Sequence, residues 1–243
     1  MTVRRTMTAR SVILSVLLGA HPASASAADL VKLTADFGIK ETALRVALTR
    51  MVATGDLIRS ADGYRLSGRL QARQRRQDAA MRPSVLPWQG GWYVAVVTSI
   101  GAGSAERAAL RVALRDGRFG ELREGVWMRP DNIEWQLESV FRSRIRVLHA
   151  HDDAPVDLAA TLWDLPAWAA AGERLLNEMD CAPAVHDRFL VAAAIVRHLL
   201  TDPVLPAELL PPAWPGVRLR TAYQGFVAEL ESRRDAIQLT EVG

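Results

Sequence analysis

Threonine and arginine side chains recur along one side of a predicted helix that begins near residue 40. Thr42, Arg45 and Thr49 are separated by three and four residues, which places them on one face at about 3.6 residues per turn. An arginine guanidinium can donate two hydrogen bonds to a guanine edge, and a threonine hydroxyl can donate or accept there. This spacing predicts a helix face that contacts base edges in DNA. A surface helix with an ordinary solvated face would show the same pattern, so the surrounding elements must decide.

Basic residues beside this face predict contacts with phosphates. They are Lys40, Arg50, Arg59 and Arg65, and Arg50 has an alternative role as an internal brace of the domain. Residues 1–82 carry 14 basic and 6 acidic residues, a net charge of +8, whereas the rest of the chain carries 16 basic and 21 acidic residues, a net charge of −5. A basic first third on a mildly acidic body predicts one module that binds a polyanion.

A helix-turn-helix would position these side chains. Ser26 is the predicted N-cap of a short helix, Gly38 breaks that helix, and a second helix starts near Lys40 and ends before Gly55, which suits a left-handed cap. Apolar residues recur at i, i+3, i+4 and i+7 on the back of the second helix, at Leu44, Ala47, Leu48 and Met51. Two short helices joined at a glycine, with threonine and arginine in front of the second, are typical of this motif.

A predicted β-hairpin follows the second helix. Two short runs that resemble strands flank Asp62-Gly63, which is a strong signal for a two-residue turn. The order of helix, turn, helix and hairpin predicts a winged helix, with Arg59 and Arg65 on the wing. The Arg-rich stretch up to Pro83 is predicted to be a polar helix or linker that ends the first domain, residues 1–82.

The start of the chain has two interpretations. Arg4, Arg5 and Arg10 precede an apolar run, and an Ala-Ser run follows at 23–27, which is the pattern of a secretory signal peptide. A winged helix also needs a helix ahead of the helix-turn-helix, and residues 10–18 supply one with an apolar side. We therefore expect a structural helix in a cytoplasmic protein, with an exported binding protein as the alternative.

Three stretches resemble the PaaX family of transcription regulators. They are the helix-turn-helix and hairpin at 37–69, the run WQGGWYVAVV at 88–97, and the run LLTDPVLPAELLPPAWPG at 199–216. The resemblance implies a repressor of phenylacetic acid catabolism or a related operon, released from DNA by an aryl-acyl-coenzyme A such as phenylacetyl-CoA. Two features depart from the family pattern: Lys40 stands where a serine N-cap is common, and the helix before the Pro-rich run is almost wholly apolar.

Strands and helices alternate in the acidic body. Expected strands lie at 92–100, 124–131 and 144–152, and expected helices lie at 104–122, with Ser104 as N-cap, and at 133–141. This order predicts a small α+β sandwich over residues 83–154. It resembles the ferredoxin-like middle domain of the family, which in turn resembles a nuclease subunit of CRISPR adaptation, and that likeness implies dimerisation.

Helices predominate in the last domain, residues 155–243. They are expected at 162–179, 188–200 and 222–237, with a Pro-rich strap that packs through Leu209, Leu210 and Trp214. This domain is a candidate for effector sensing, although no residue identifies an effector pocket. The predicted fold class is therefore α+β, with an N-terminal winged helix, a ferredoxin-like middle domain and a mainly helical C-terminal domain.

Few other residues have types and spacings that suggest chemistry. His149 and His151 lie on one side of a predicted strand and precede two acids, so they are candidate ligands of a divalent metal, but spacing identifies no third ligand. Solvated polar residues at a strand end are the alternative interpretation. Asp116, Asp131 and Glu134 suit a nuclease acid cluster, although nothing in their spacing requires one. A metal-dependent nuclease is therefore the alternative function.

The sequence thus predicts a regulator that is not an enzyme and needs no metal or cofactor. Its expected partners are double-stranded DNA with an inverted-repeat operator, a second copy of the chain and a small-molecule effector, without a membrane. The single cysteine, Cys181, excludes an intramolecular disulfide and is predicted to be a small core residue.

Overall fold

The computed structural model describes residues 8–20, 22–35, 37–99, 103–136 and 138–239. These residues form two compact units. The first unit combines the described chain up to Met81 with Leu175–Arg197 and with the chain from Arg218 onward, and the second combines Arg82–Arg174 with His198–Val217. The predicted α+β class is confirmed, because helices accompany two antiparallel sheets in the described chain.

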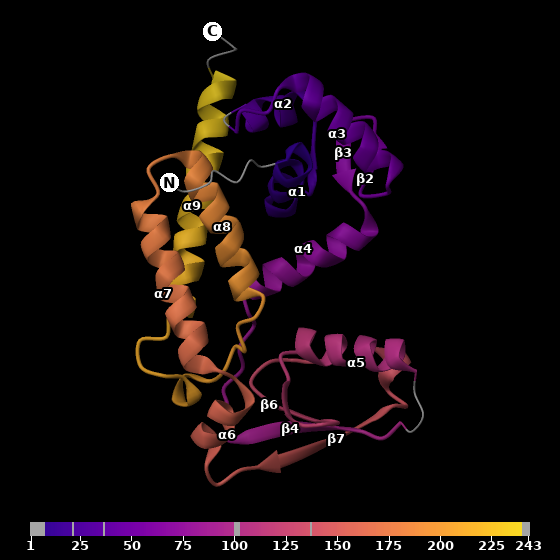
Figure 1. Cartoon of the computed structure of the whole chain (residues 1–243), viewed down its shortest axis with the longest axis vertical. Helices are drawn as coiled ribbons and strands as arrows, with labels where there is room; N and C mark the ends of the chain where they lie inside the picture. Colours follow the sequence, from indigo (N-terminus) through magenta and orange to yellow (C-terminus); the bar gives the residue numbers. More distant parts are fainter. Residues whose placement is uncertain (1–7, 21, 36, 100–102, 137, 240–243) are drawn as a thin grey trace. The chain divides into compact units, whose positions relative to one another are not determined.

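The first unit contains a winged helix. Its elements are α1 Ala9–Gly19, β1 Ser24–Ala25, α2 Ala27–Ala35, α3 Glu41–Ala53, β2 Leu57–Ser60 and β3 Gly63–Leu66. The strands pair antiparallel in the order β1-β3-β2, so the short strand before α2 completes the sheet of the wing. Helix α1 contacts α2 and α3 and forms the centre of this arrangement (Figure 1).

Local sequence signals set the ends of these elements. Ser26 caps α2, because its Oγ accepts a hydrogen bond from the Asp29 backbone N–H at 3.0 Å while the Asp29 carboxylate accepts one from the Ser26 hydroxyl at 2.8 Å. Helix α3 begins after Lys40, whose side chain makes no capping hydrogen bond. Gly63 has a φ of +134°, and a Cβ added there would lie 2.3 Å from the Ala25 carbonyl oxygen, so the hairpin requires glycine.

The apolar run at the start of the chain is part of the winged-helix core. Ile13 and Leu17 of α1 are fully buried. They belong to one cluster with the apolar sides of α3 and the wing, through Leu44, Leu48, Met51, Leu57 and Leu66. Burying each such side chain contributes about 1.5–3 kcal/mol, so this run has the structural role that was predicted. Arg4 and Arg5 of the signal-like pattern lie outside the described residues.

Four further helices contribute to the first unit. They are α4 Gly68–Met81, the end of α7 Leu165–Cys181, most of α8 Val185–Leu199 and most of α9 Gly216–Leu239. Gln74 of α4 donates to the carbonyl oxygens of Leu18 and Ala20 at the end of α1, at 3.1 and 2.8 Å. Phe37, in the turn between α2 and α3, packs on Phe189 of α8 with ring centroids 4.6 Å apart. The helix-turn-helix is therefore braced by C-terminal residues.

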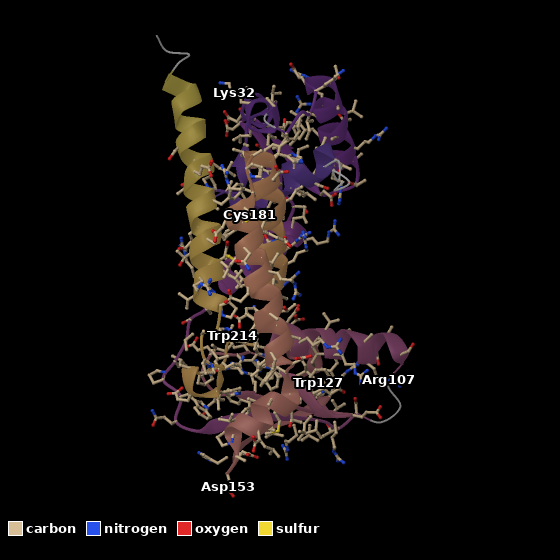
Figure 2. The ribbon with its side chains drawn as sticks, turned by 60° about the vertical axis from the view of Figure 1, so that its left-hand side comes forward. Lys32, Arg107, Trp127, Asp153, Cys181 and Trp214 are labelled. Carbon is tan, nitrogen blue, oxygen red and sulfur yellow. The ribbon has the colours of Figure 1, made fainter. Side chains whose placement is uncertain are left out.

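The second unit is built on a four-stranded antiparallel sheet. Its strands are β4 Gly91–Val97, β5 Gly120–Arg123, β6 Val126–Pro130 and β7 Ile145–His151, in the order β5-β6-β4-β7. Helix α5 (Ser104–Asp116) covers one face, and Trp127 lies between this helix and the sheet (Figure 2). This strand order and the α5 crossover are those of a ferredoxin-like fold, as predicted.

Helix α5 is shorter than predicted. It ends at Asp116, its N-cap is Gly103 rather than Ser104, and the residues beyond it form β5 instead of further helix. Just after the helix, Arg118 adopts a φ of +64° and its guanidinium donates to the backbone carbonyl oxygen of Asp202 at 2.9 Å. Asp202 lies more than eighty positions after Arg118 in the sequence, so no local pattern indicates that the two residues are in contact.

The predicted helix over 133–141 is wrong. Apart from Leu137, which lies outside the described residues, this segment is irregular and contains only the short 3-10 turn Ser139–Phe141. The rings of Trp135 and Phe119 pack edge to face, with centroids 4.7 Å apart. Individual core contacts of this kind override a helical pattern in the sequence.

The opposite face of the sheet packs against the helix that follows β7 and against the Pro-rich strap. The single helix expected at 162–179 is divided into α6 Pro155–Leu162 and α7 Leu165–Cys181. Leu209 of the Pro-rich strap is buried in the cluster formed with this face. Trp214 stacks on Trp168 with centroids 4.3 Å apart and an angle of 10°, which confirms the strap's packing role.

Candidate DNA-binding surface

Helix α3 turns the side chains predicted to contact DNA outward. The exposed ones are Lys40, Thr42, Arg45, Thr49 and Arg50. On the opposite side, Leu44 and Leu48 are at most 1 % exposed. The two sides of α3 therefore divide as the 3.6-residue period requires, and the polar side is available to a partner.

Arg45 is held by an acid of its own helix. Its Nε donates to Glu41 Oε1 at 2.8 Å, and its Nη2 lies 2.6 Å from the same oxygen. Both side chains are at least half exposed, so this pair is worth only about 0.3–0.5 kcal/mol. Arg45 can therefore exchange Glu41 for a guanine edge at small cost, and Glu41 keeps the guanidinium on the outward side until then.

A groove of about 690 Å³ runs beside the outward side of α3. Its walls come from the start of α1 and from α3, and include Arg10, Thr42, Val46, Arg50 and Thr54. Val46 is 51 % exposed on this side of the helix. An apolar side chain between threonine and arginine suits contact with a thymine methyl group.

The wing carries one arginine on each of its faces. Arg59 pairs with Tyr64 across the hairpin, and Ile58 pairs with Arg65. Directly paired residues point to the same face and neighbours along a strand alternate, so Arg59 lies on the core-facing side, along with Leu57, and Arg65 lies on the outer side. Both arginines are exposed, but the structure does not bring them together.

Sequence reasoning missed a buried acid beside this surface. Asp56 is 2 % exposed and accepts hydrogen bonds from Arg10 Nη2 at 2.8 Å and from Arg69 Nη2. The hydrogen bond from Arg10, assisted by the charges of both arginines, holds the pKa of Asp56 below its usual range in spite of the opposing effect of burial. The only local sign of this buried acid in the sequence was its position directly after the Gly55 cap, and the neighbouring residues do not indicate which side chains bind it.

The other chemical candidates stay apart. His149 and His151 are exposed on β7, and the ring of His149 packs on Tyr93 with centroids 4.6 Å apart. No group of three or more His, Cys, Asp or Glu side chains that could hold a metal ion occurs among the described residues. The structure therefore does not gather the proposed acid cluster, which comprised Asp116, Asp131 and Glu134.

Two further observations concern the chain as a whole. Cys181 is exposed at the end of α7, so the prediction of a core position was wrong. Within the ranges that the structure describes, each helix is too short or too polar to cross a bilayer.

Comparison with known proteins assigns the chain to a family. Residues 8–70 match a model described as PaaX-like protein, residues 86–150 match the PaaX protein central Cas2-like domain, and residues 163–238 match the PaaX-like protein C-terminal domain. No curated protein matches significantly. A solved structure, the uncharacterized protein Rv0674 from Mycobacterium tuberculosis, is 64% identical, with a TM-score of 0.85 over 95% of this chain and 99% of that one. The three matched regions cover most of the chain, which therefore belongs to the PaaX family.

Proposed function

We propose that this protein is a DNA-binding transcriptional repressor. One observation carries the proposal: within a winged helix, α3 buries its apolar side and presents threonine and arginine outward. Thr42, Arg45 and Thr49 contact base edges, because their side chains suit the major groove. Phosphate contacts come from Lys40, Arg50, Arg59 and Arg65. This activity places the protein in the cytoplasm, where its DNA target lies.

The repressor acts as a homodimer on an inverted repeat. Each protomer places one α3 in the major groove of one half-site, so that the dimer geometry sets a half-site spacing of about 34–36 Å or a multiple of it. The ferredoxin-like domain supports this assignment through its family likeness, and it is the proposed dimerisation module.

An aryl-acyl-coenzyme A releases the repressor from an aromatic-acid catabolic operon, with phenylacetyl-CoA as the first candidate. The family resemblance supports this effector class. The almost wholly apolar helix that precedes the Pro-rich strap departs from the family, so a related acyl-CoA is the second candidate. The packing of Phe37 on Phe189 supports a role for the C-terminal helices in setting the position of α3.

The test is binding to the DNA upstream of the protein's own and neighbouring genes, measured with and without phenylacetyl-CoA. We expect a slower-migrating, intact DNA band that phenylacetyl-CoA abolishes. The same incubation with Mg²⁺ or Mn²⁺ examines the nuclease alternative, because cleaved DNA would contradict the repressor. A shift that phenylacetyl-CoA leaves unchanged would refute this effector while retaining the DNA-binding assignment.

A further inference from the structure

A buried carboxylate holds two exposed guanidinium groups beside α3. Asp56 follows the glycine that ends α3, and its Oδ2 accepts from Arg10 Nε at 3.2 Å and from Arg10 Nη2 at 2.8 Å. Its Oδ1 accepts from Arg69 Nη2 at the start of α4. The side chain of Arg10 is 57% exposed and that of Arg69 is 73% exposed, so one buried acid orients two cations that face solvent.

This cluster lies next to the candidate DNA-binding surface. Arg10 forms part of the groove wall together with Val46 and Arg50 of α3. The Asp56 side chain accepts a further hydrogen bond from Thr54, which is also on the groove wall. Arg10 is therefore held in the wall of the groove beside α3, and Asp56 links Arg69 to it.

The charges and donors of this cluster suit an anion. One carboxylate faces two guanidinium groups, so the cluster keeps one net positive charge. Each guanidinium carries several N–H donors in a fixed fork, and Asp56 engages only part of each fork. Arginine forks match the oxygen atoms of a phosphate and bind them more strongly than neutral donors do.

We propose that Arg10 and Arg69 clamp one backbone phosphate of bound DNA and that Asp56 is the positioning residue of this clamp. The proposal rests on the proposed DNA-binding function and adds a contact outside α3 and the wing. The clamp is independent of sequence, because phosphate contacts fix the register of a protein on DNA and leave base recognition to other side chains.

The clamp and simple electrostatics predict opposite effects of Asp56→Asn on the affinity for DNA. Asp56→Asn removes a negative charge beside the DNA, and general attraction would then rise. If Asp56 positions the two arginines, the loss of its charge-assisted hydrogen bonds frees both guanidinium groups, and affinity falls instead. We expect a weakening of about fivefold to tenfold for this variant.

The experiment measures binding of the full chain to a random-sequence duplex of about 30 base pairs by fluorescence anisotropy, at salt concentrations from about 50 to 200 mM. The variants are Arg10→Gln, Arg69→Gln, both together and Asp56→Asn, with Arg75→Gln on the same helix α4 as the matched control. Circular dichroism at the assay temperature confirms that each variant is folded. The two arginine variants keep the test decisive if Asp56→Asn unfolds.

We expect each single arginine variant to weaken binding about tenfold and to reduce the slope of log K against log salt by about 0.9, the value for one phosphate. The double variant should lose little more, because both arginines share that phosphate. Losses equal to that of Arg75→Gln, or slopes that add in the double variant, would overturn the clamp. A wild-type protein that binds no duplex would instead refute the proposed function, and the clamp with it.

Discussion

At the scale of single residues, the outward side of α3 carries both the proposed base contacts and some of the proposed phosphate contacts. Arg45 and Thr49 are linked along the helix, since the Thr49 hydroxyl donates to the Arg45 carbonyl oxygen at 3.0 Å. Glu41 holds the Arg45 guanidinium on the same side. Lys40 stands before the first turn without a capping role, so its charge is available to the DNA backbone. The two kinds of residue should therefore respond differently to substitution.

Arg45→Ala should reduce discrimination between the operator and its single-base variants by about 1–3 kcal/mol at the position that Arg45 contacts, because a bidentate contact to guanine is lost. Lys40→Ala is the comparison variant and should weaken all duplexes alike, because it removes a phosphate contact. Competition binding with a set of single-base variants of the selected site measures both. Equal loss on every duplex after Arg45→Ala would contradict a base contact.

Asp56 should make stability depend on pH. Its folded-state pKa lies below the unfolded value of about 3.9, chiefly because Arg10 donates to the charged carboxylate. The contribution is therefore fully present above that unfolded value and is lost as the pH falls through the folded value. We expect Asp56→Asn to lower the free energy of unfolding by about 1–3 kcal/mol at neutral pH.

Urea unfolding of wild type and Asp56→Asn, at neutral pH and below the unfolded pKa, checks this expectation. The difference between the two proteins should shrink in acid, because the wild-type carboxylate then becomes protonated. A difference that stays constant over this range would show that the ionised carboxylate is not the stabilising group.

At the scale of elements, the wing carries one exposed arginine on each of its two faces. Its register places Arg59 and Arg65 on opposite faces of the hairpin, so one phosphate cannot accept from both. The turn itself depends on Gly63, where any side chain would collide with the β1 backbone. Under the proposed function, the two arginines would therefore contact separate phosphates.

Arg59→Ala and Arg65→Ala should each weaken binding to all sequences and lower the salt slope by about 0.9. The losses should add in the double variant, because the two side chains contact different phosphates. This outcome differs from that expected for Arg10 and Arg69. Salt titrations of the three variants measure it, and a double variant no weaker than either single one would refute separate contacts.

At the scale of the whole molecule, the chain folds back so that its C-terminal part braces its beginning. The turn between α2 and α3 packs through Phe37 on Phe189, and Phe189 contacts Phe226 of α9. Arg220 of α9 donates to the Ala80 carbonyl oxygen in the last turn of α4, at 2.9 Å. The compact unit that presents α3 therefore includes residues from both ends of the chain.

Phe37→Ala should lower the free energy of unfolding by about 2–3 kcal/mol, because it removes a half-buried ring from this aromatic cluster. Phe37→Leu should recover most of that loss, since it keeps the apolar contact with α8. Urea denaturation followed by circular dichroism measures both variants. If Phe37→Ala were as stable as the wild type, the turn would not depend on the C-terminal helices.

The sequence by itself determined the local parts of this protein. The apolar repeat behind α3, the Ser26 cap, the glycine turns and Asp62-Gly63 act within a few residues, so periodicity and turn chemistry predicted the winged helix and the outward direction of Arg45. The sequence also predicted strands β4, β6 and β7, helix α5 and the ferredoxin-like class of this sheet, although it missed β5 and predicted a helix over 133–141 that did not form.

Only the tertiary structure decided which distant residues meet. Arg10 reaches Asp56 across 46 positions, and Phe37 meets Phe189 in a helix far along the chain. The segment around Trp135 is irregular instead of helical for the same reason, because the Trp135 ring packs on Phe119. Such contacts depend on how buried surfaces fit together in three dimensions, and no short-range pattern along the chain encodes that fit.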